Sequence, residues 1–143
     1  MRIIFVCTGN TCRSPMAEKM FSAMVGDESV EVLSRGVMCT ENMPMNLNAR
    51  AVMLERGLPT SHKSKAITRE DIDGADIIIT MTDSHKRFIE MTFGESAKIH
   101  ALGEVTGNGD VIDPYGGDIY EYRRCARRLE GDLAILKDRI MAK

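Results

Sequence analysis

The chain opens with a short apolar run, IIFV at residues 3–6, which stops at Cys7. A short run of β-branched and aromatic residues bounded by turn residues predicts a strand that is buried on both faces. A turn-prone segment, TGNT, follows at residues 8–11, and from Pro15 onward the apolar residues recur with the period of a helix. A strand, a tight loop and a helix in succession indicate a parallel sheet, with the sulfur of Cys7 at the carboxyl end of its first strand.

The same alternation continues through the rest of the sequence. Further strands are expected at residues 29–36, 75–81 and 97–102. Helices are expected at residues 15–24, 46–57, 68–75 and 82–94, and a last long helix has its apolar face on Tyr122, Ala126, Leu129, Leu133, Leu136 and Ile140. The Gly- and Asp-rich segment 103–118 is expected to be a loop. We therefore predict an α/β fold, organised as one domain over residues 1–143, in which ligands bind at the carboxyl ends of the strands.

The composition narrows the possible partners of the protein. A formal net charge of -2 gives no basic field that would attract nucleic acid or a membrane surface. No apolar run is long enough to span a membrane and no signal-peptide pattern precedes the first strand, so we expect a cytoplasmic protein. The cysteines and histidines lack the spacing of a metal site, so neither a metal nor a cofactor is expected, and the histidines (His62, His85 and His100) are interpreted as structural or solvent-facing.

The segment CTGNTCRS at residues 7–14 has the features of an anion-binding loop that carries a nucleophile. Between a strand and a helix, its backbone N–H groups can turn inward beside the positive end of the helix dipole. Gly9 and Asn10 tolerate the left-handed backbone that such a loop needs, and the planar guanidinium of Arg13 suits phosphate oxygens. This positive surrounding favours the thiolate of Cys7, and the Ser14 hydroxyl can donate a hydrogen bond to it. The combination predicts phosphoryl transfer through a phosphocysteine.

Taken one at a time, these residues have simpler interpretations. A cysteine at a strand end is most often a small buried apolar residue, and a Gly-Asn pair is most often a turn. The spacing decides between the two, because the cysteine and Arg13 enclose five residues at a strand-to-helix junction. The Walker-type pattern G-x-x-x-x-G-K-[ST] is absent from the sequence, so hydrolysis of ATP or GTP is not supported.

The string VCTGNTCRSPMAE resembles the signature loop of the low-molecular-weight protein tyrosine phosphatase family. The segments SRGV, ADIIITMTDSHK and DPYGGD also lie where that family has similar segments, so the resemblance covers the whole chain. It implies a four-stranded parallel sheet with helices on both faces. It also implies that Cys7 is the nucleophile, Arg13 the phosphate clamp and Asp113 the general acid. The remaining residues expected to bind the substrate or its phosphate are Thr8, Gly9, Asn10, Thr11, Cys12, Ser14 and Tyr115.

The general acid can also be argued from the chemistry of the reaction. A carboxyl group above the loop must protonate the leaving group as its bond to phosphorus breaks. Asp113 precedes Pro114, which holds it in an extended conformation on a loop, and Tyr115 can form an aromatic wall. Asp110 is the rival acid, in the GNGD segment, whose composition indicates a mobile loop. We favour Asp113.

The residue at position 11, a threonine, helps to predict which phosphorylated residue is the substrate. Tyrosine-directed members of the family carry a bulky aliphatic residue at this position, whereas the bacterial protein-arginine phosphatases, which this sequence resembles more closely, carry threonine. The resemblance therefore implies a phosphatase that removes phosphate from arginine in phosphorylated proteins. We expect the protein to be a monomer. A protein tyrosine phosphatase is the first alternative. Arsenate reductase and a non-catalytic anion-binding module are further alternatives. Arsenate reductase would need a resolving pair of cysteines in the middle of the chain, but the sequence has no cysteine between Cys39 and Cys125. A non-catalytic module would be expected to lack the nucleophile, the clamp or the acid, and the sequence offers a candidate for each.

Cys12 lies in the same loop as Cys7 and has two open interpretations. It can form a reversible disulfide with Cys7 that protects the nucleophile from over-oxidation, or it can be an inert loop residue. The other two cysteines, Cys39 and Cys125, are expected to be buried apolar positions.

Overall fold

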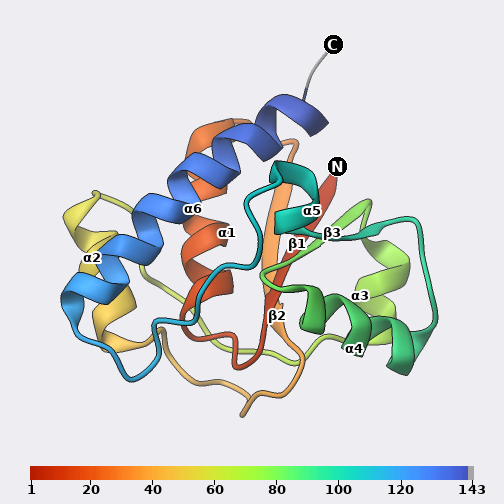
Figure 1. Ribbon diagram of the computed structural model, residues 1–143, viewed down its shortest axis with the longest axis horizontal. Helices are drawn as coiled ribbons and strands as arrows, with labels where there is room; N and C mark the ends of the chain where they lie inside the picture. The colour runs from red at the N-terminus through yellow and green to blue at the C-terminus, as the bar shows by residue number, and fades with distance from the viewer. Residues whose placement is uncertain (142–143) are drawn as a thin grey trace.

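The computed structural model describes residues 1–141, and within them a four-stranded parallel sheet lies between two layers of helices (Figure 1). The strands are β1 (Arg2–Cys7), β2 (Glu31–Gly36), β3 (Ile77–Thr80) and β4 (Ile99–Ala101), and their order across the sheet is β2-β1-β3-β4. The helices are α1 (Arg13–Val25), α2 (Leu47–Glu55), α3 (Arg69–Gly74), α4 (Asp83–Phe93), α5 (Leu102–Thr106) and α6 (Ile119–Ile140). The α/β fold with a four-stranded parallel sheet is confirmed.

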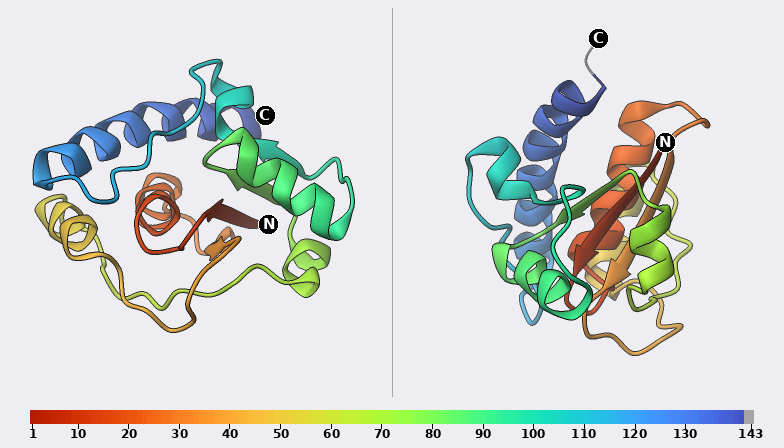
Figure 2. Two further views of the ribbon diagram at one scale, coloured as in Figure 1. Left: turned by 60° about the horizontal axis from the view of Figure 1, so that its bottom comes forward. Right: turned by 90° about the vertical axis from the view of Figure 1, so that its right-hand side faces the viewer.

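Alternate residues of β1 supply the two halves of the core. Ile3 and Phe5 face the layer formed by α1, α2 and α6, where the ring of Phe5 packs edge-on against that of Phe21 at 5.5 Å. Ile4 and Val6 face the other layer, formed by α3 and α4. Figure 2 shows the two helical layers on opposite sides of the strands. All four side chains are fully buried, which explains why the run is apolar at every position and does not alternate with polar residues.

Several helix boundaries follow from capping. The Thr68 hydroxyl accepts a hydrogen bond from the Asp71 N–H, and the Asp71 carboxylate accepts one from the Thr68 N–H, which forms the capping box expected from the sequence. Thr82 is the N-cap residue of α4, and its hydroxyl accepts a hydrogen bond from the His85 N–H. None of the helices within residues 1–141 has the length and apolarity needed to cross a membrane.

The structure corrects three expectations. The segment 103–118 is not loop throughout, because α5 (Leu102–Thr106) occupies its beginning and Leu102 is fully buried. The first helix begins at Arg13 and not at Pro15, so the guanidinium-bearing residue stands in the first helical turn. Cys39 is half-buried, whereas Cys125 is buried as expected.

The end of β2 supports the loop that follows β1. Gly36 pairs with Cys7 in the sheet, and the next two N–H groups along the chain donate to the carbonyl oxygens of Cys7 and Thr8 at 3.0 Å each. A Cβ atom at Gly36 would lie 2.7 Å from the Thr8 carbonyl oxygen and 3.1 Å from the Cβ of Asn10. Only glycine lets the strand approach the loop this closely.

We therefore predict that Gly36→Ala displaces the loop after β1 and destabilises the protein by about 1–3 kcal/mol. Urea unfolding measures the change in the free energy of unfolding, and kcat/KM on a phosphorylated substrate measures the change at the loop. Gly131→Ala is the matched control, because a Cβ at that exposed helical position meets nothing within 4 Å. It should maintain kcat/KM and raise stability by up to about 1 kcal/mol. Wild-type behaviour of Gly36→Ala would contradict this account of the strand end.

Candidate active site

A pocket lies at the carboxyl end of β1, where the loop into α1 meets the segment before α6 (Figure 1). The residues that line it are Cys7, Thr8, Gly9, Thr11, Cys12, Arg13, Asp113 and Tyr115. The two segments are far apart in the sequence, and the fold brings them together at the edge of the sheet where α/β proteins bind ligands. Of the ten residues that the sequence singles out, only Asn10 and Ser14 do not line the pocket, and both lie beneath it as fully buried residues.

Asn10 holds the loop in shape from below. Its backbone is left-handed, with φ 56°, and its side chain is fully buried. The amide nitrogen donates to the hydroxyls of Ser14 at 2.9 Å and Ser34 at 3.0 Å, and the amide oxygen accepts from the N–H of Lys65 at 2.9 Å. The Asn10 carbonyl oxygen also accepts a hydrogen bond from Nε2 of His62 at 2.6 Å. These bonds connect the loop to α1, to β2 and to the segment before α3.

The thiol of Cys7 lies beside a hydroxyl and the beginning of a helix. Cys7 is 2% exposed, and its Sγ is 2.9 Å from the Oγ of Ser14. That hydroxyl accepts a hydrogen bond from Asn10, and its own proton can point either to the sulfur or to the carbonyl oxygen of Arg35, which is farther away at 3.4 Å. No side chain among the described residues caps α1 at its N-cap residue, Cys12, so the first-turn N–H groups remain open to an anion. This surrounding stabilises negative charge on the sulfur.

Arg13, at the end of the loop, contacts the segment that carries Asp113. Its guanidinium is almost fully buried, and Nη1 donates to the carbonyl oxygen of Val111 at 3.0 Å. Nη2 lies 3.4 Å from Oδ2 of Asp113, whose side chain is half exposed. The other carboxylate oxygen of Asp113 accepts a hydrogen bond from the N–H of Tyr115 at 3.0 Å. Asp113 is therefore positioned over the pocket by its own turn and by the arginine.

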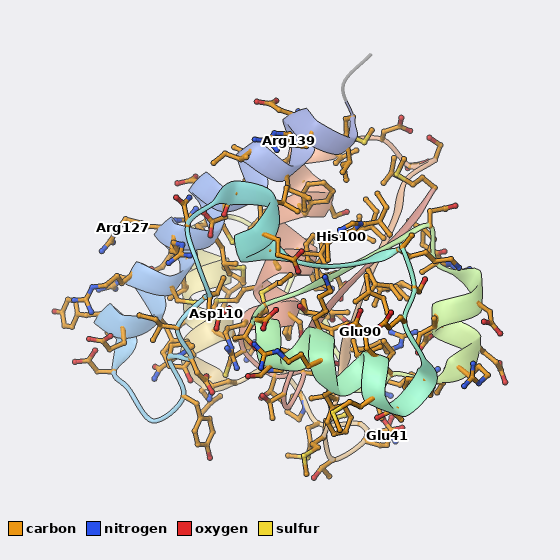
Figure 3. All side chains as sticks on the ribbon, turned by 45° about the vertical axis from the view of Figure 1, so that its right-hand side comes forward. Glu41, Glu90, His100, Asp110, Arg127 and Arg139 are labelled. Carbon is orange, nitrogen blue, oxygen red and sulfur yellow. The ribbon has the colours of Figure 1, made fainter. Side chains whose placement is uncertain are left out.

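The rival acid, Asp110, is engaged elsewhere. Its Oδ1 accepts a hydrogen bond from the N–H of Asp83 at 2.9 Å, so it satisfies a backbone group at the start of α4, where Figure 3 also shows it. It does not line the pocket formed by the described residues. Of the two carboxylates, Asp113 is the one that lines the pocket.

Two histidines contact the loop, which the sequence did not reveal. Nε2 of His85 is 2.8 Å from the hydroxyl oxygen of Thr8, and His62 bonds the Asn10 carbonyl from below. Burial lowers the pKa of both rings, and burial together with the charge of Arg13 lowers that of His85 to about 4. Neither histidine is close to the loop in sequence, so no local pattern signals these contacts.

Cys12 packs away from the solvent against the last helix. Its Sγ lies 3.4 Å from the hydroxyl of Tyr122, and burial raises the pKa of the thiol. Both Cys7 and Cys12 are free thiols within the described residues. The disulfide between these two cysteines stays a prediction.

The fold and the loop define a class of α/β proteins in which a cysteine at the end of the first strand lines a pocket suited to an anion. Comparison with known proteins identifies the family. The sequence profile of the family described as "Low molecular weight phosphotyrosine protein phosphatase" matches residues 2–143. The chain belongs to this family.

Individual relatives fall into two groups by name. The protein-arginine-phosphatase of Bacillus subtilis is 42% identical over 135 residues, which cover 91% of this chain and 90% of the relative. The low molecular weight protein-tyrosine-phosphatase PtpB of Staphylococcus haemolyticus is 38% identical over 130 residues, which cover 90% and 92% of the two chains. Among solved structures, the C7S mutant of the YwlE arginine phosphatase with a phosphorylated active-site serine superposes with a TM-score of 0.94. It is 39% identical, and the match covers 100% of this chain and 97% of that one.

The contact between Ser14 and the sulfur generates a prediction. Ser14→Ala removes the donor to the thiolate and should lower kcat about tenfold or more, because a hydrogen bond to a charged group stabilises by about 1.5–3 kcal/mol. Alkylation of Cys7 by iodoacetamide at neutral pH should slow in the same variant. Ser22→Ala, at an exposed position of the same helix, is the control and should change neither rate. Unchanged alkylation of Ser14→Ala would contradict the assigned contact.

Proposed function

We propose that this chain is a protein-arginine phosphatase that acts through a phosphocysteine on Cys7. The observation that carries the proposal is the convergence of the Cys7 thiol, the Arg13 guanidinium and the Asp113 carboxyl group on one pocket. A nucleophile, a phosphate-binding cation and a general acid are the groups that phosphoryl transfer requires. Identity of 42% to a protein-arginine-phosphatase supports the substrate class.

In the first step, the thiolate of Cys7 attacks phosphorus and the bond from phosphorus to the arginine nitrogen breaks. The leaving nitrogen takes a proton from the carboxyl group of Asp113, because a deprotonated guanidine is too basic to leave unaided. Arg13 and the loop N–H groups bind the phosphoryl oxygens, on which negative charge gathers. Ser14 donates its hydrogen bond to the sulfur until the bond to phosphorus forms.

In the second step, water releases the phosphoryl group. The Asp113 carboxylate takes a proton from the water, the oxygen attacks phosphorus, and the sulfur leaves as a thiolate. Ser14 again donates to the sulfur as negative charge returns to it. Inorganic phosphate and the free thiolate are the products, so the cycle closes without a cofactor.

Phosphoarginine is favoured over phosphotyrosine by the residues around the pocket. Thr11 lines it with a small polar side chain, and the Asp113 carboxylate that remains after the proton transfer can balance the charge of the departing guanidinium. Tyr115, which is 75% exposed at the rim, can stack on either a guanidinium or a phenol ring. Tyrosine phosphatase is the second candidate, supported by the 38% identity to PtpB. The monomeric state and the cytoplasmic location expected from the sequence stay predictions.

The substrate preference is tested at Thr11. The wild-type protein should have a higher kcat/KM on a phosphoarginine peptide than on the matched phosphotyrosine peptide. Thr11→Ile should lower the phosphoarginine value by about tenfold or more, because an apolar wall leaves the polar N–H groups without partners. Its phosphotyrosine value should be maintained or rise. Thr92→Ile, on the exposed face of α4, is the control. A large wild-type preference for phosphotyrosine would overturn the substrate assignment but not the phosphocysteine mechanism.

The role of Asp113 is tested by leaving-group dependence. Asp113→Asn should lower kcat on phosphoarginine by roughly 100-fold or more, since no proton reaches the basic nitrogen. Its effect on p-nitrophenyl phosphate should be smaller, because nitrophenolate leaves with little protonation. Asp110→Asn provides the comparison with the rival carboxylate and should spare kcat on both substrates. Equal losses of Asp113→Asn on the two substrates would show that this carboxyl group does not protonate the leaving group.

A further inference from the structure

A buried histidine contacts the pocket without a role in the steps above. His85 stands in the first turn of α4, and its side chain is almost fully buried. Nε2 lies 2.8 Å from Oγ1 of Thr8, one of the residues that line the pocket. The other ring nitrogen, Nδ1, is buried and has no hydrogen-bond partner among the described residues.

The unpartnered nitrogen indicates which tautomer is present. A neutral imidazole carries its proton on one nitrogen and a lone pair on the other. A buried N–H without an acceptor is rarer than a buried acceptor without a donor. Nδ1 of His85 therefore carries the lone pair, and Nε2–H donates to the Thr8 hydroxyl oxygen.

The charges around His85 favour this neutral form. Arg13 repels a protonated ring, while Asp110 and Asp113 attract it more weakly, and burial is the largest effect. Together they lower the pKa of His85 to about 4. The ring is therefore a neutral donor at neutral pH.

The donated hydrogen bond determines what Thr8 can do. Because the hydroxyl oxygen accepts from His85, its own proton is left to donate to another acceptor. Thr8 is an exposed residue of the pocket that also contains Cys7 and Arg13, so the oxygen of a phosphoryl group bound there is an acceptor in the same pocket. An unoriented threonine would share its proton with water.

We propose that Thr8 donates a hydrogen bond to the phosphoryl group and that His85 is the positioning residue that orients its hydroxyl. The inference rests on the proposed phosphocysteine mechanism and adds a side-chain donor to the loop amides. It applies to any phosphoryl substrate, because the contact is made to phosphate oxygens and not to the leaving group.

A double-mutant cycle tests the pair. Thr8→Val should lower kcat/KM on p-nitrophenyl phosphate about tenfold or more, because it removes a hydrogen bond to a charged acceptor. His85→Leu should lower it by roughly fivefold, because the hydroxyl stays but loses the donor that orients it. The double variant should lose no more than Thr8→Val alone, because both changes remove the same contact. The inhibition constant of inorganic phosphate should rise in parallel. Thr8→Ser retains the hydroxyl and His85→Gln retains an N–H near the position of Nε2, so both should recover most of the loss.

Several outcomes would overturn the proposal. Losses that multiply in the double variant, or wild-type phosphate inhibition in Thr8→Val, show that the two residues do not act as a pair. A thermal unfolding measurement shows whether His85→Leu folds. If it does not fold, kcat/KM and phosphate inhibition of Thr8→Val and His85→Gln decide whether the pair acts as proposed. The measurements use p-nitrophenyl phosphate, so they remain informative even if the wild-type protein does not hydrolyse phosphoarginine. A failure of the proposed substrate is thereby separated from a failure of this pair.

Discussion

The buried amide of Asn10 is the contact on which the site depends. It joins three separate parts of the chain, through Ser14, Ser34 and the backbone of Lys65, and its own backbone is left-handed. Asparagine is one of the few residues apart from glycine that adopts this conformation readily, and glycine could not supply the amide. Loss of the amide would remove one hydrogen bond each from Ser14 and Ser34, which keep contacts to Cys7 and Glu18. It would also take away the acceptor of the Lys65 N–H, and a lost hydrogen bond costs about 0.5–1.5 kcal/mol. The shape of the loop is thus determined by a polar network below it, while the pocket above stays open for an anion.

The fold could be predicted from sequence because short apolar segments alternate with segments of helical period along the chain. The run at residues 3–6 is apolar at every position, and the structure covers both faces of β1. The short α5 was missed because five residues are too few for a helical period to become visible. The sequence pattern predicts the start of α1 two residues too late, for a different reason. Pro15 is typical of a first helical turn, but Arg13 and Ser14 already belong to that turn.

The part of the candidate site that is continuous in the sequence could be predicted from it. Residues 7–14 form one loop, so their types and spacing stand together in the sequence, and the pocket contains six of these eight residues. The histidines were not predictable, because His62 and His85 reach the loop only through the packing of α4 and of the segment before α3. The choice between Asp110 and Asp113 likewise depends on tertiary structure. One carboxylate accepts from the start of α4 and the other lies over the pocket, a difference that two nearby aspartates in a Gly-rich segment do not reveal.

In the proposed mechanism, Arg13 connects the binding of phosphate to the position of the general acid, Asp113. One edge of its guanidinium holds the backbone before Asp113 through Val111, and the other edge lies near the Asp113 carboxylate. A phosphoryl group in the pocket competes with that carboxylate for the same donors, because the planar fork can pair with either. Since the bond to Val111 does not involve the carboxylate, the segment can stay anchored while the side chain is released. In the proposed mechanism, the carboxyl group then has a phosphoryl anion beside it in place of a cation. A carboxyl group released from the guanidinium in this way can turn toward the leaving nitrogen, which it must reach to donate its proton.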